Sequence, residues 1–236
     1  MNKSLRDAQL KLLETFGKAA KTFALAGGTA LELFYLKHRF SRDLDFFSPV
    51  YNVKEIDNII DKFGETMGAP VKYENEFVSS SHAKVRFYSV KPKGISDPLK
   101  IDFVEDVLFD KPTIRKFSNI PVYDIKNIYF QKIMTLTGAN LSKDETGREI
   151  TAGRKEARDI FDIYCLSKKI EPLHKYLKDL DNKYQRGIIH WYRSYSRQET
   201  KIGMLDLEIY DSEFDVSEMI RYLDSEINKF MAEVIE

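Results

Sequence analysis

The stretch AGGTALELFYLKHRFSRDLDFF, residues 26–47, decides the fold that we expect for this chain. An apolar run ends at Gly27 and Gly28, a stretch of helical length follows from Thr29, and residues 42–47 have the composition of a strand. Paired glycines let the backbone turn sharply and approach a ligand closely, and Thr29 can cap the helix that follows. The sequence therefore predicts a strand, a glycine turn, a helix and a second strand at the centre of the fold.

Two features of this stretch suit a nucleoside triphosphate. The N-terminus of the expected helix offers N–H groups to a phosphate. Asp43 and Asp45 are two residues apart on the second strand, so both side chains point to one face, with Cα atoms about 6.6–7 Å apart. Carboxylates at that distance can hold Mg²⁺ ions that assist phosphoryl transfer. An ordinary glycine turn and a solvated strand end are the simpler alternatives.

A third carboxylate comes from a strand that we expect over residues 99–104. In that strand Asp102 stands on the face opposite to the most apolar one. If the strand lies beside residues 42–47, Asp102 joins the acidic pair and completes a metal site. An ion pair of Asp102 with Lys100 or Arg86 is the alternative.

The remaining pattern predicts a mixed α/β sheet flanked by helices, followed by a mainly helical C-terminal part. We expect a catalytic domain over residues 1–120 and a helical domain that completes the site over residues 121–236. The polar stretch 138–153 is interpreted as an inserted loop. Apolar spacing predicts helices at 4–20, 29–37, 53–65, 124–136, 153–166 and 216–234, two helices within 172–200, and strands at 22–26, 71–73 and 83–90.

The composition is that of a globular chain, since 43% of the 236 residues are hydrophobic and 13% are aromatic. No apolar run approaches the ~18 residues of a membrane span, and the N-terminus is unlike a signal peptide, so we expect a cytoplasmic protein without membrane contact. The single cysteine, Cys165, lies in an apolar helical run that predicts a buried thiol. The formal net charge is zero, but residues 205–236 hold ten acidic and two basic residues, so the rest of the chain is positively charged.

The order of these residues resembles a known family. Gly27-Gly28-Thr29, then Arg39, Ser41 and Asp43-Leu44-Asp45, are similar to the opening signature of the AbiEii/AbiGii-type nucleotidyltransferase toxins, members of the polymerase-beta-like nucleotidyltransferase superfamily. The resemblance implies a nucleotidyltransferase fold, an NTP as co-substrate and two Mg²⁺ ions. The metal ligands that it implies are Asp43, Asp45 and Asp102, and the nucleotide-binding residues are Gly27, Gly28, Thr29, Arg39, Ser41, Lys132 and Arg158.

Later parts of the chain resemble the remaining motifs of the family. Lys132 falls within an apolar helical stripe, and the resemblance places a lysine there near the nucleotide phosphates; a lysine that extends to solvent is the alternative. In the stretch 153–166, the resemblance makes Arg158, Asp159 and Asp162 part of the site, with a carboxylate acting as base or orienting Lys132.

These later motifs have an alternative interpretation and a departure from the family pattern. Asp159 and Asp162 also have the spacing for helix-surface ion pairs with Lys155 and Arg158. The arginine expected in the third motif is absent, because Asn140 stands there, and Arg154 is a candidate replacement.

The resemblance implies an enzyme that transfers NMP from an NTP to an acceptor, as the toxin of a bacterial toxin–antitoxin or phage-defence pair with a cognate antitoxin. Residues 183–198 combine four cations with several aromatic rings and no acids, which favours tRNA or another RNA as acceptor, although a packed amphipathic helix is the simpler interpretation. A small-molecule (antibiotic) nucleotidyltransferase and a non-catalytic interaction module with the same fold are the alternatives.

Overall fold

A computed structural model describes residues 3–79, 82–92, 97–138, 141–143, 149–151 and 153–235. The chain divides into two compact units, unit 1 with Met1–Tyr35 and Phe40–Ile128, and unit 2 with Leu36–Arg39 and Tyr129–Glu236. The short segment Leu36–Arg39 therefore belongs to unit 2, although the residues before and after it belong to unit 1. The expected division into a catalytic domain and a helical domain near residue 120 concerns function and stays a prediction.

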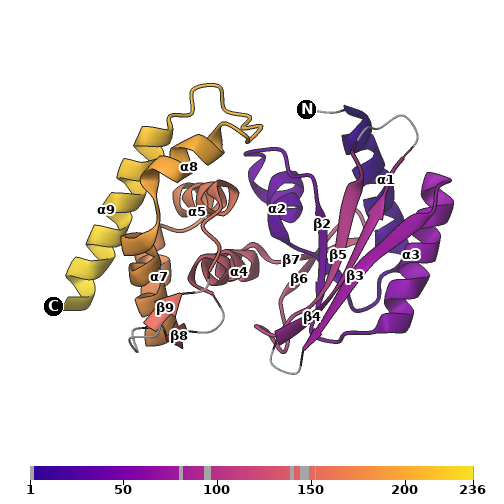
Figure 1. Cartoon of the computed structure of the whole chain (residues 1–236), viewed down its shortest axis with the longest axis horizontal. Coiled ribbons are helices and arrows are strands. Elements are labelled where there is room, and N and C mark those ends of the chain that lie inside the picture. The colour runs from indigo at the N-terminus through magenta and orange to yellow at the C-terminus, as the bar shows by residue number, and fades with distance from the viewer. Residues whose placement is uncertain are drawn as a thin grey trace. The chain divides into compact units, whose positions relative to one another are not determined.

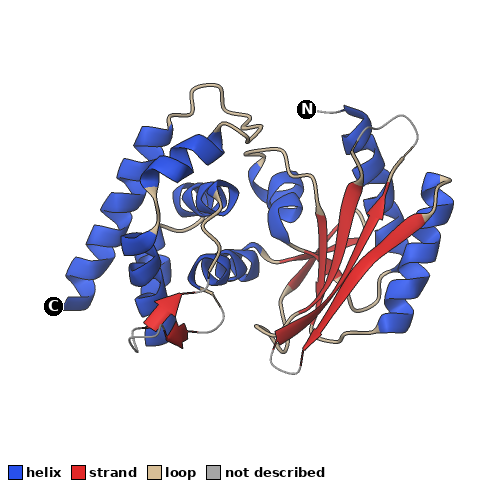
Figure 2. Cartoon of the chain, viewed as in Figure 1, coloured by secondary structure: helices blue, strands red, loops and turns tan. Residues whose placement is uncertain are grey.

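Unit 1 is built on a seven-stranded mixed sheet in the order β3-β4-β5-β2-β1-β7-β6 (Figures 1 and 2). The central strand β2 runs parallel to β5 and antiparallel to β1, and β1 runs parallel to β7. The expected mixed sheet is therefore confirmed. Its strands are β1 (Ala24–Leu25), β2 (Leu44–Ser48), β3 (Val71–Ser79), β4 (His82–Val90), β5 (Leu99–Glu105), β6 (Ile114–Phe117) and β7 (Ile120–Tyr123).

Two helices, α1 (Lys3–Ala19) and α3 (Val53–Met67), pack against each other on one face of this sheet (Figure 1). The rings of Phe16 from α1 and Phe46 from β2 stack with centroids 3.9 Å apart, and Phe46 also contacts Phe63 of α3. Because side chains alternate along a strand, the neighbours of Phe46 point to the opposite face. The apolar core thus fixes which face of β2 and β5 carries the acidic residues.

The helix expected over residues 29–37 is present, but it starts earlier than expected and is only partly α-helical. Helix α2 begins at the glycines (Gly27–Ala30) and continues as a π-helical segment, η1 (Leu31–Leu36). π-Helical turns are rare and occur frequently at functional sites. The segment ends at Lys37, whose φ of 50° is in the left-handed region that few residues other than glycine adopt.

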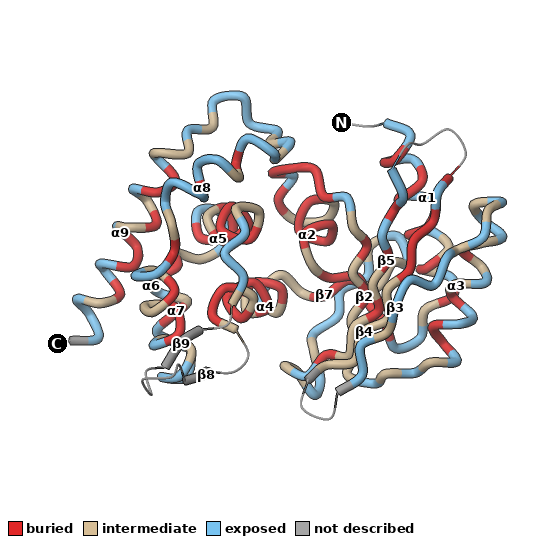
Figure 3. The backbone as a smooth tube through the Cα atoms, in the orientation of Figure 1, coloured by how far each residue is buried: buried red, intermediate tan, exposed pale blue. Residues whose placement is uncertain are grey.

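Unit 2 is mainly helical, as expected (Figure 2). Helices α4 and α5 carry many of its buried residues (Figure 3). The expected loop over 138–153 contains two short paired strands, β8 (Leu141–Lys143) and β9 (Glu149–Thr151). The helices are α4 (Ile125–Thr137), which begins in unit 1, α5 (Ala157–Lys169), α6 (Leu173–Lys178), α7 (Asn182–Ser194), α8 (Arg197–Met204) and α9 (Val216–Ile235).

The β6–β7 hairpin and helix α8 had no counterpart among the elements expected from the sequence. The hairpin turns at Ser118 and Asn119, which both have positive φ (48° and 71°), as in the two-residue turns that match strand twist. Asparagine tolerates this left-handed conformation, so the Ser118-Asn119 pair was the sequence feature that could have predicted the hairpin. Within the described residues, none of the helices combines the length and the apolar character that crossing a membrane requires.

Candidate functional site

The glycine turn lies directly against the first acidic strand. Gly27 has a φ of +67°, and a Cβ atom built on it would lie 2.4 Å from Asp45 Oδ2. A side chain at this position would therefore strain the backbone and collide with the carboxylate. The need for glycine follows from both the torsion angle and the available space.

The two expected acidic strands are neighbours, which is the condition on which the third carboxylate depended. Strands β2 and β5 run parallel, and Asp45 is the direct partner of Asp102 across the pair. Both residues are half-buried and alternate with buried apolar residues that face the α1–α3 side. Parallel strands lie about 4.8 Å apart, so these two carboxylates share a face at close range.

Asp43 lies just before β2 rather than within the expected strand, and it is half-buried. Among the residues that the structure describes, no three His, Cys, Asp or Glu side chains converge closely enough to form a complete metal-binding cluster. The site therefore has two carboxylates in register, Asp45 and Asp102. The third carboxylate, Asp43, belongs to the residue that immediately precedes β2. Mg²⁺ commonly uses one or two carboxylates and takes its remaining ligands from substrate phosphates and water.

Thr29 does not cap the helix, contrary to expectation. The N-cap position is Ala26, and no side chain caps it. The buried hydroxyl of Thr29 instead donates to the backbone carbonyl of Asp43, while the N–H of Ala26 donates to the carbonyl of Asp45 at 2.9 Å. Because the helix starts two residues earlier than expected, Thr29 connects it to the acidic stretch.

Ser41, expected to contact the nucleotide, is held through its backbone. Its N–H donates to Glu32 Oε2 at 2.8 Å, and its carbonyl accepts from Gln9 Nε2 at 3.0 Å. The same Gln9 nitrogen donates to the carbonyl of Arg42 at 2.8 Å. The backbone immediately before Asp43 is thus fixed by two buried side chains of unit 1.

In unit 2, Asp162 is the centre of a buried ion network. The carboxylate is fully buried and forms a bidentate pair with Arg39, with Nε–Oδ1 and Nη2–Oδ2 distances of 2.7 and 2.8 Å. His38 Nε2 lies 2.7 Å from Oδ1, and Lys132 Nζ lies 2.8 Å from Oδ2. This network explains why the segment 36–39 belongs to unit 2.

Lys132 lies between two carboxylates. Its ammonium is 2.7 Å from Asp159 Oδ1 as well as 2.8 Å from Asp162. Burial lowers the pKa of Lys132, but the charges of Asp159 and Asp162 outweigh it, so the net pKa is raised. Burial likewise raises the pKa of Asp162, but Arg39 and Lys132 lower it more, so its pKa lies well below the ordinary value.

These contacts exclude one of the two alternatives for the last motif. Asp159 and Asp162 are 2% and 0% exposed, so they do not form an exposed face of α5 with Lys155 and Arg158 as partners. Lys132 Nζ donates to Asp159 Oδ1 at 2.7 Å, which is the contact that an orienting carboxylate needs, and the role itself stays a prediction. The second oxygen of Asp159, Oδ2, is buried without a hydrogen-bond partner among the residues that the structure describes.

Three further residues belong to the expected motifs. Arg158 pairs with Glu156 at 2.6 Å and is partly exposed. Arg154, the candidate replacement for the missing motif arginine, is exposed. Asn140 lies outside the described residues.

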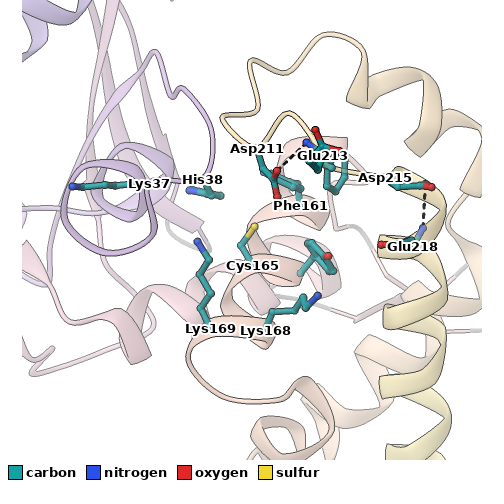
Figure 4. Close-up of a pocket in the computed structure, with 12 residues that line it drawn as sticks. Lys37, His38, Phe161, Cys165, Lys168, Lys169, Asp211, Glu213, Asp215 and Glu218 are labelled. Carbon is teal, nitrogen blue, oxygen red and sulfur yellow. Dashed lines mark hydrogen bonds between the residues drawn. The ribbon is translucent and has the colours of Figure 1, made fainter.

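A cavity of about 370 Å³ opens in unit 2 beside the ion network (Figure 4). His38 and Cys165 line it, and burial raises the pKa of the Cys165 thiol to about 12, which agrees with the expected buried thiol. Three lysines and four acidic residues also line the cavity. Because these charges nearly cancel, the cavity does not by itself favour an anion such as a triphosphate.

Sequence reasoning missed three polar residues that matter here. His38 is not among the residues expected to contribute to the site, yet it contacts Asp162. Gln9 and Glu32 lie in apolar helical segments, and both are buried, at 0% and 3% exposure. A glutamine four residues after Leu5 on the apolar stripe was the available signal, because a buried amide requires partners.

Comparisons with known proteins show which family the chain belongs to. The sequence profile of the family described as "Nucleotidyl transferase AbiEii toxin, Type IV TA system" matches residues 11–227. The chain belongs to this family. The expected resemblance is therefore confirmed, and the AbiEii-family chain is a nucleotidyltransferase of a type IV toxin–antitoxin system.

Two solved structures from Helicobacter pylori are similar to the AbiEii-family chain over nearly its whole length. One is a candidate nucleotidyltransferase, with a TM-score of 0.58 and 15% identity over 99% of this chain and 96% of that chain. The other is JHP933, with a TM-score of 0.59 and 14% identity over the same shares. At these identities the likeness shows the fold, which is the expected nucleotidyltransferase fold. A comparison with curated proteins gave no match.

Proposed function

We propose that the chain transfers a nucleoside monophosphate from an NTP to a hydroxyl of an RNA acceptor, in a reaction that depends on divalent metal. The acceptor oxygen forms a bond to the α-phosphorus, the bond to the leaving pyrophosphate breaks, and the hydroxyl proton is removed by a base. The observation that carries the proposal is the pair Asp45 and Asp102, in register on parallel strands, with Gly27 packed against Asp45. This combines a carboxylate pair with a glycine turn at the start of a helix.

The donors suit Mg²⁺. Oxygen ligands from two or three carboxylates are typical of magnesium sites in phosphoryl transfer, and the absence of a fuller protein cage in the described residues leaves positions for phosphate oxygens and water. When bound, two such ions would lower the pKa of the attacking hydroxyl and stabilise the departing pyrophosphate. Asp45 and Asp102, with Asp43, are the residues that would hold them.

The remaining residues of unit 1 would bind and orient the nucleotide. Gly27 and Gly28 allow the backbone to approach the triphosphate, and the start of α2 presents N–H groups to it. Thr29 and Ser41 act by fixing the backbone of the acidic stretch, since the hydrogen bonds of both involve that backbone.

For unit 2, the proposed roles of Lys132, Arg158, Asp159 and Asp162 rest on the family resemblance. The burial of Asp162 and its contacts with Arg39, His38 and Lys132 favour an organising role for this carboxylate. Asp159 keeps one oxygen without a partner among the described residues, which supports a role as proton acceptor. Arg39 is bound to Asp162, so we propose it as part of the same network rather than as a direct phosphate ligand.

A basic stripe on α7 supports RNA as the acceptor. Lys183, Arg186, His190 and Arg193 follow the 3-4-3 spacing of one helix face, and the three cations of this set are exposed. The opposite face packs inward through Ile188 and Trp191, so the aromatic tryptophan is part of the core. A stripe of cations without acids suits a phosphate backbone.

Incubation with each labelled NTP, Mg²⁺ and total tRNA tests the proposal. We expect label transfer to RNA, reduced ~100-fold or more in Asp45→Asn, because metal ions supply several kcal/mol of transition-state stabilisation and each ~1.4 kcal/mol is a factor of ten. Asp61→Asn, an exposed aspartate on α3, is the matched control and should retain activity.

Two outcomes would count against the proposal. Transfer to small molecules such as aminoglycosides but not to RNA would overturn the acceptor. No transfer to any acceptor, together with no binding of Mn²⁺ or NTP, would overturn the enzyme. The toxin–antitoxin membership of the family also leads us to propose a cognate antitoxin as partner.

A further inference from the structure

The backbone from Ser41 to Asp45 is held at almost every residue. The Ser41 N–H and the carbonyls of Ser41, Arg42, Asp43 and Asp45 each take part in a hydrogen bond to another segment of unit 1. Four of these five contacts come from side chains, those of Gln9, Glu32 and Thr29. Such a density of contacts is unusual for a segment that only connects two elements, because connecting segments usually run over the surface and are mobile.

Gln9 of α1 makes the two central contacts. It is completely buried, and its amide nitrogen donates to the carbonyls of Ser41 and Arg42 at 3.0 and 2.8 Å. One amide NH₂ group has two hydrogens, so both are used on adjacent peptide groups. This geometry fixes the orientation of the peptide that leads into Asp43.

Glu32 makes the third contact. Its carboxylate is 3% exposed and accepts from the Ser41 N–H and from Arg6 of α1. The guanidinium of Arg6 also lies 4.6 Å from the ring centroid of Phe40, which precedes Ser41. A buried pair of this kind is costly to desolvate, so its contribution to stability alone is small.

We infer that Gln9 and Glu32 are positioning residues for the metal-binding aspartates: they clamp residues 41 and 42 so that Asp43 and Asp45 keep the spacing that a divalent ion requires. The inference rests on the proposed function. Residues that orient metal ligands from behind typically change metal affinity about 10–100-fold when they are substituted. Neither residue touches the substrate or the metal in this account.

Mn²⁺ binding, followed by electron paramagnetic resonance on the purified chain, tests the inference without relying on activity. Gln9→Met keeps the length of the side chain and removes both donors. We expect Mn²⁺ affinity to fall on the order of tenfold, and the Mg²⁺ concentration for half-maximal label transfer to rise by a similar factor.

The matched control is Gln185→Met in unit 2. Gln185 also donates from Nε2 to carbonyls, those of Leu177 at 3.1 Å and Leu180 at 2.9 Å, so its loss removes the same kind of bond. We expect Mn²⁺ affinity within twofold of the wild type. A purely structural effect would weaken binding in both variants or in neither.

Thermal melting shows whether Gln9→Met folds. If it does not fold, a second variant tests the inference. The double change Arg6→Met, Glu32→Met removes the buried pair together, so no charge is left uncompensated, and releases the Ser41 N–H. It should weaken Mn²⁺ binding in the same direction. Wild-type affinity in the variants that fold, or equal weakening in Gln185→Met, would overturn the inference. Absence of Mn²⁺ binding and label transfer in the wild type would instead overturn the proposed function, and the inference with it.

Discussion

At the scale of single residues, one torsion angle determines how closely the glycine turn approaches the acidic strand. Gly27 combines a left-handed φ with contact to Asp45, whereas Gly68, at the end of α3, has a similar φ of +58° and no atom within 4 Å of a built Cβ. A side chain at Gly68 would therefore cause backbone strain alone, whereas a side chain at Gly27 would cause both backbone strain and a steric clash. This difference leads to a direct prediction.

We expect Gly27→Ala to abolish label transfer and to destabilise the chain by more than the ~1–2 kcal/mol that a left-handed residue with a Cβ costs. The added methyl group must displace the Asp45 carboxylate or the turn. Gly68→Ala should cost only the backbone strain and leave transfer intact. Thermal denaturation and the label-transfer assay measure both effects. Full activity in Gly27→Ala would contradict the close approach seen here.

At the scale of elements, the ion network connects helices α4 and α5 to the segment Leu36–Arg39. Asp162 faces Arg39, His38 and Lys132, and Lys132 also faces Asp159. The segment is also held by the bridge between Arg39 and Ile209, by the bond from Tyr210 N–H to the His38 carbonyl, and by the bond from Lys169 Nζ to the Leu36 carbonyl at 3.1 Å. Unit 2 thus holds this segment through a buried carboxylate, a short backbone pairing and a lysine of α5.

Asp162→Asn should destabilise unit 2 by ~3–5 kcal/mol, because removal of one partner leaves buried charges uncompensated. Asp224→Asn is the control, since Asp224 pairs with Arg197 at a partly exposed site (31% and 42% exposed) and such pairs contribute about 1 kcal/mol or less. Denaturant unfolding followed by circular dichroism measures both variants. A similar loss of unfolding free energy in the two variants would show that the buried network stabilises the chain no more than an exposed ion pair.

The same network predicts how stability depends on pH. The folded pKa of Asp162 is depressed below its ordinary value of 3.8, so its contribution is present above about that pH and is lost as the pH falls toward the folded pKa. The folded pKa of Lys132 is raised above 10.5, so its contribution is present below that pH and is lost as the pH rises through the folded pKa. We expect the free energy of unfolding of the wild type to fall more steeply below pH 4 than that of Asp162→Asn. Parallel acid profiles of the two proteins would contradict this prediction.

At the scale of the whole molecule, the net charge of zero gives no overall attraction for RNA. The proposed binding of RNA would therefore depend on local charge such as the exposed stripe of α7. Electrostatic binding to phosphates releases counterions and falls with salt in proportion to the number of contacts. The salt dependence of tRNA binding is thus a measure of how many cations take part.

Charge reversal on this stripe tests the RNA acceptor. The double variant Arg186→Glu, Arg193→Glu should weaken tRNA binding across sequences and reduce the slope of log affinity against log salt by about 2, one for each phosphate contact. Lys54→Glu, an exposed lysine on α3, is the control. Fluorescence anisotropy at several salt concentrations measures the slopes. An unchanged slope in the double variant would show that RNA binds to another surface of the chain.

The sequence by itself determined the elements around the glycine turn, the mixed sheet, the helical remainder and the family. These depend on periodicity and spacing over short stretches, and local backbone geometry follows from them. The alternation of Asp102 with apolar residues even predicted its face, and the motif spacing brought out Asp45, Lys132 and Asp159 as candidates.

Only the tertiary structure decided which strands are neighbours and which buried polar groups meet. The pairing of Asp45 with Asp102, the contacts of Asp162 with His38 and Arg39, and the clamp from Gln9 join residues between 32 and 124 positions apart in the chain. A buried polar group needs a hydrogen-bond partner, and the packing of distant segments decides which group that is. Local sequence propensity therefore does not predict the partner. For this reason Thr29 was expected to cap a helix, although in the fold its hydroxyl binds the backbone of Asp43.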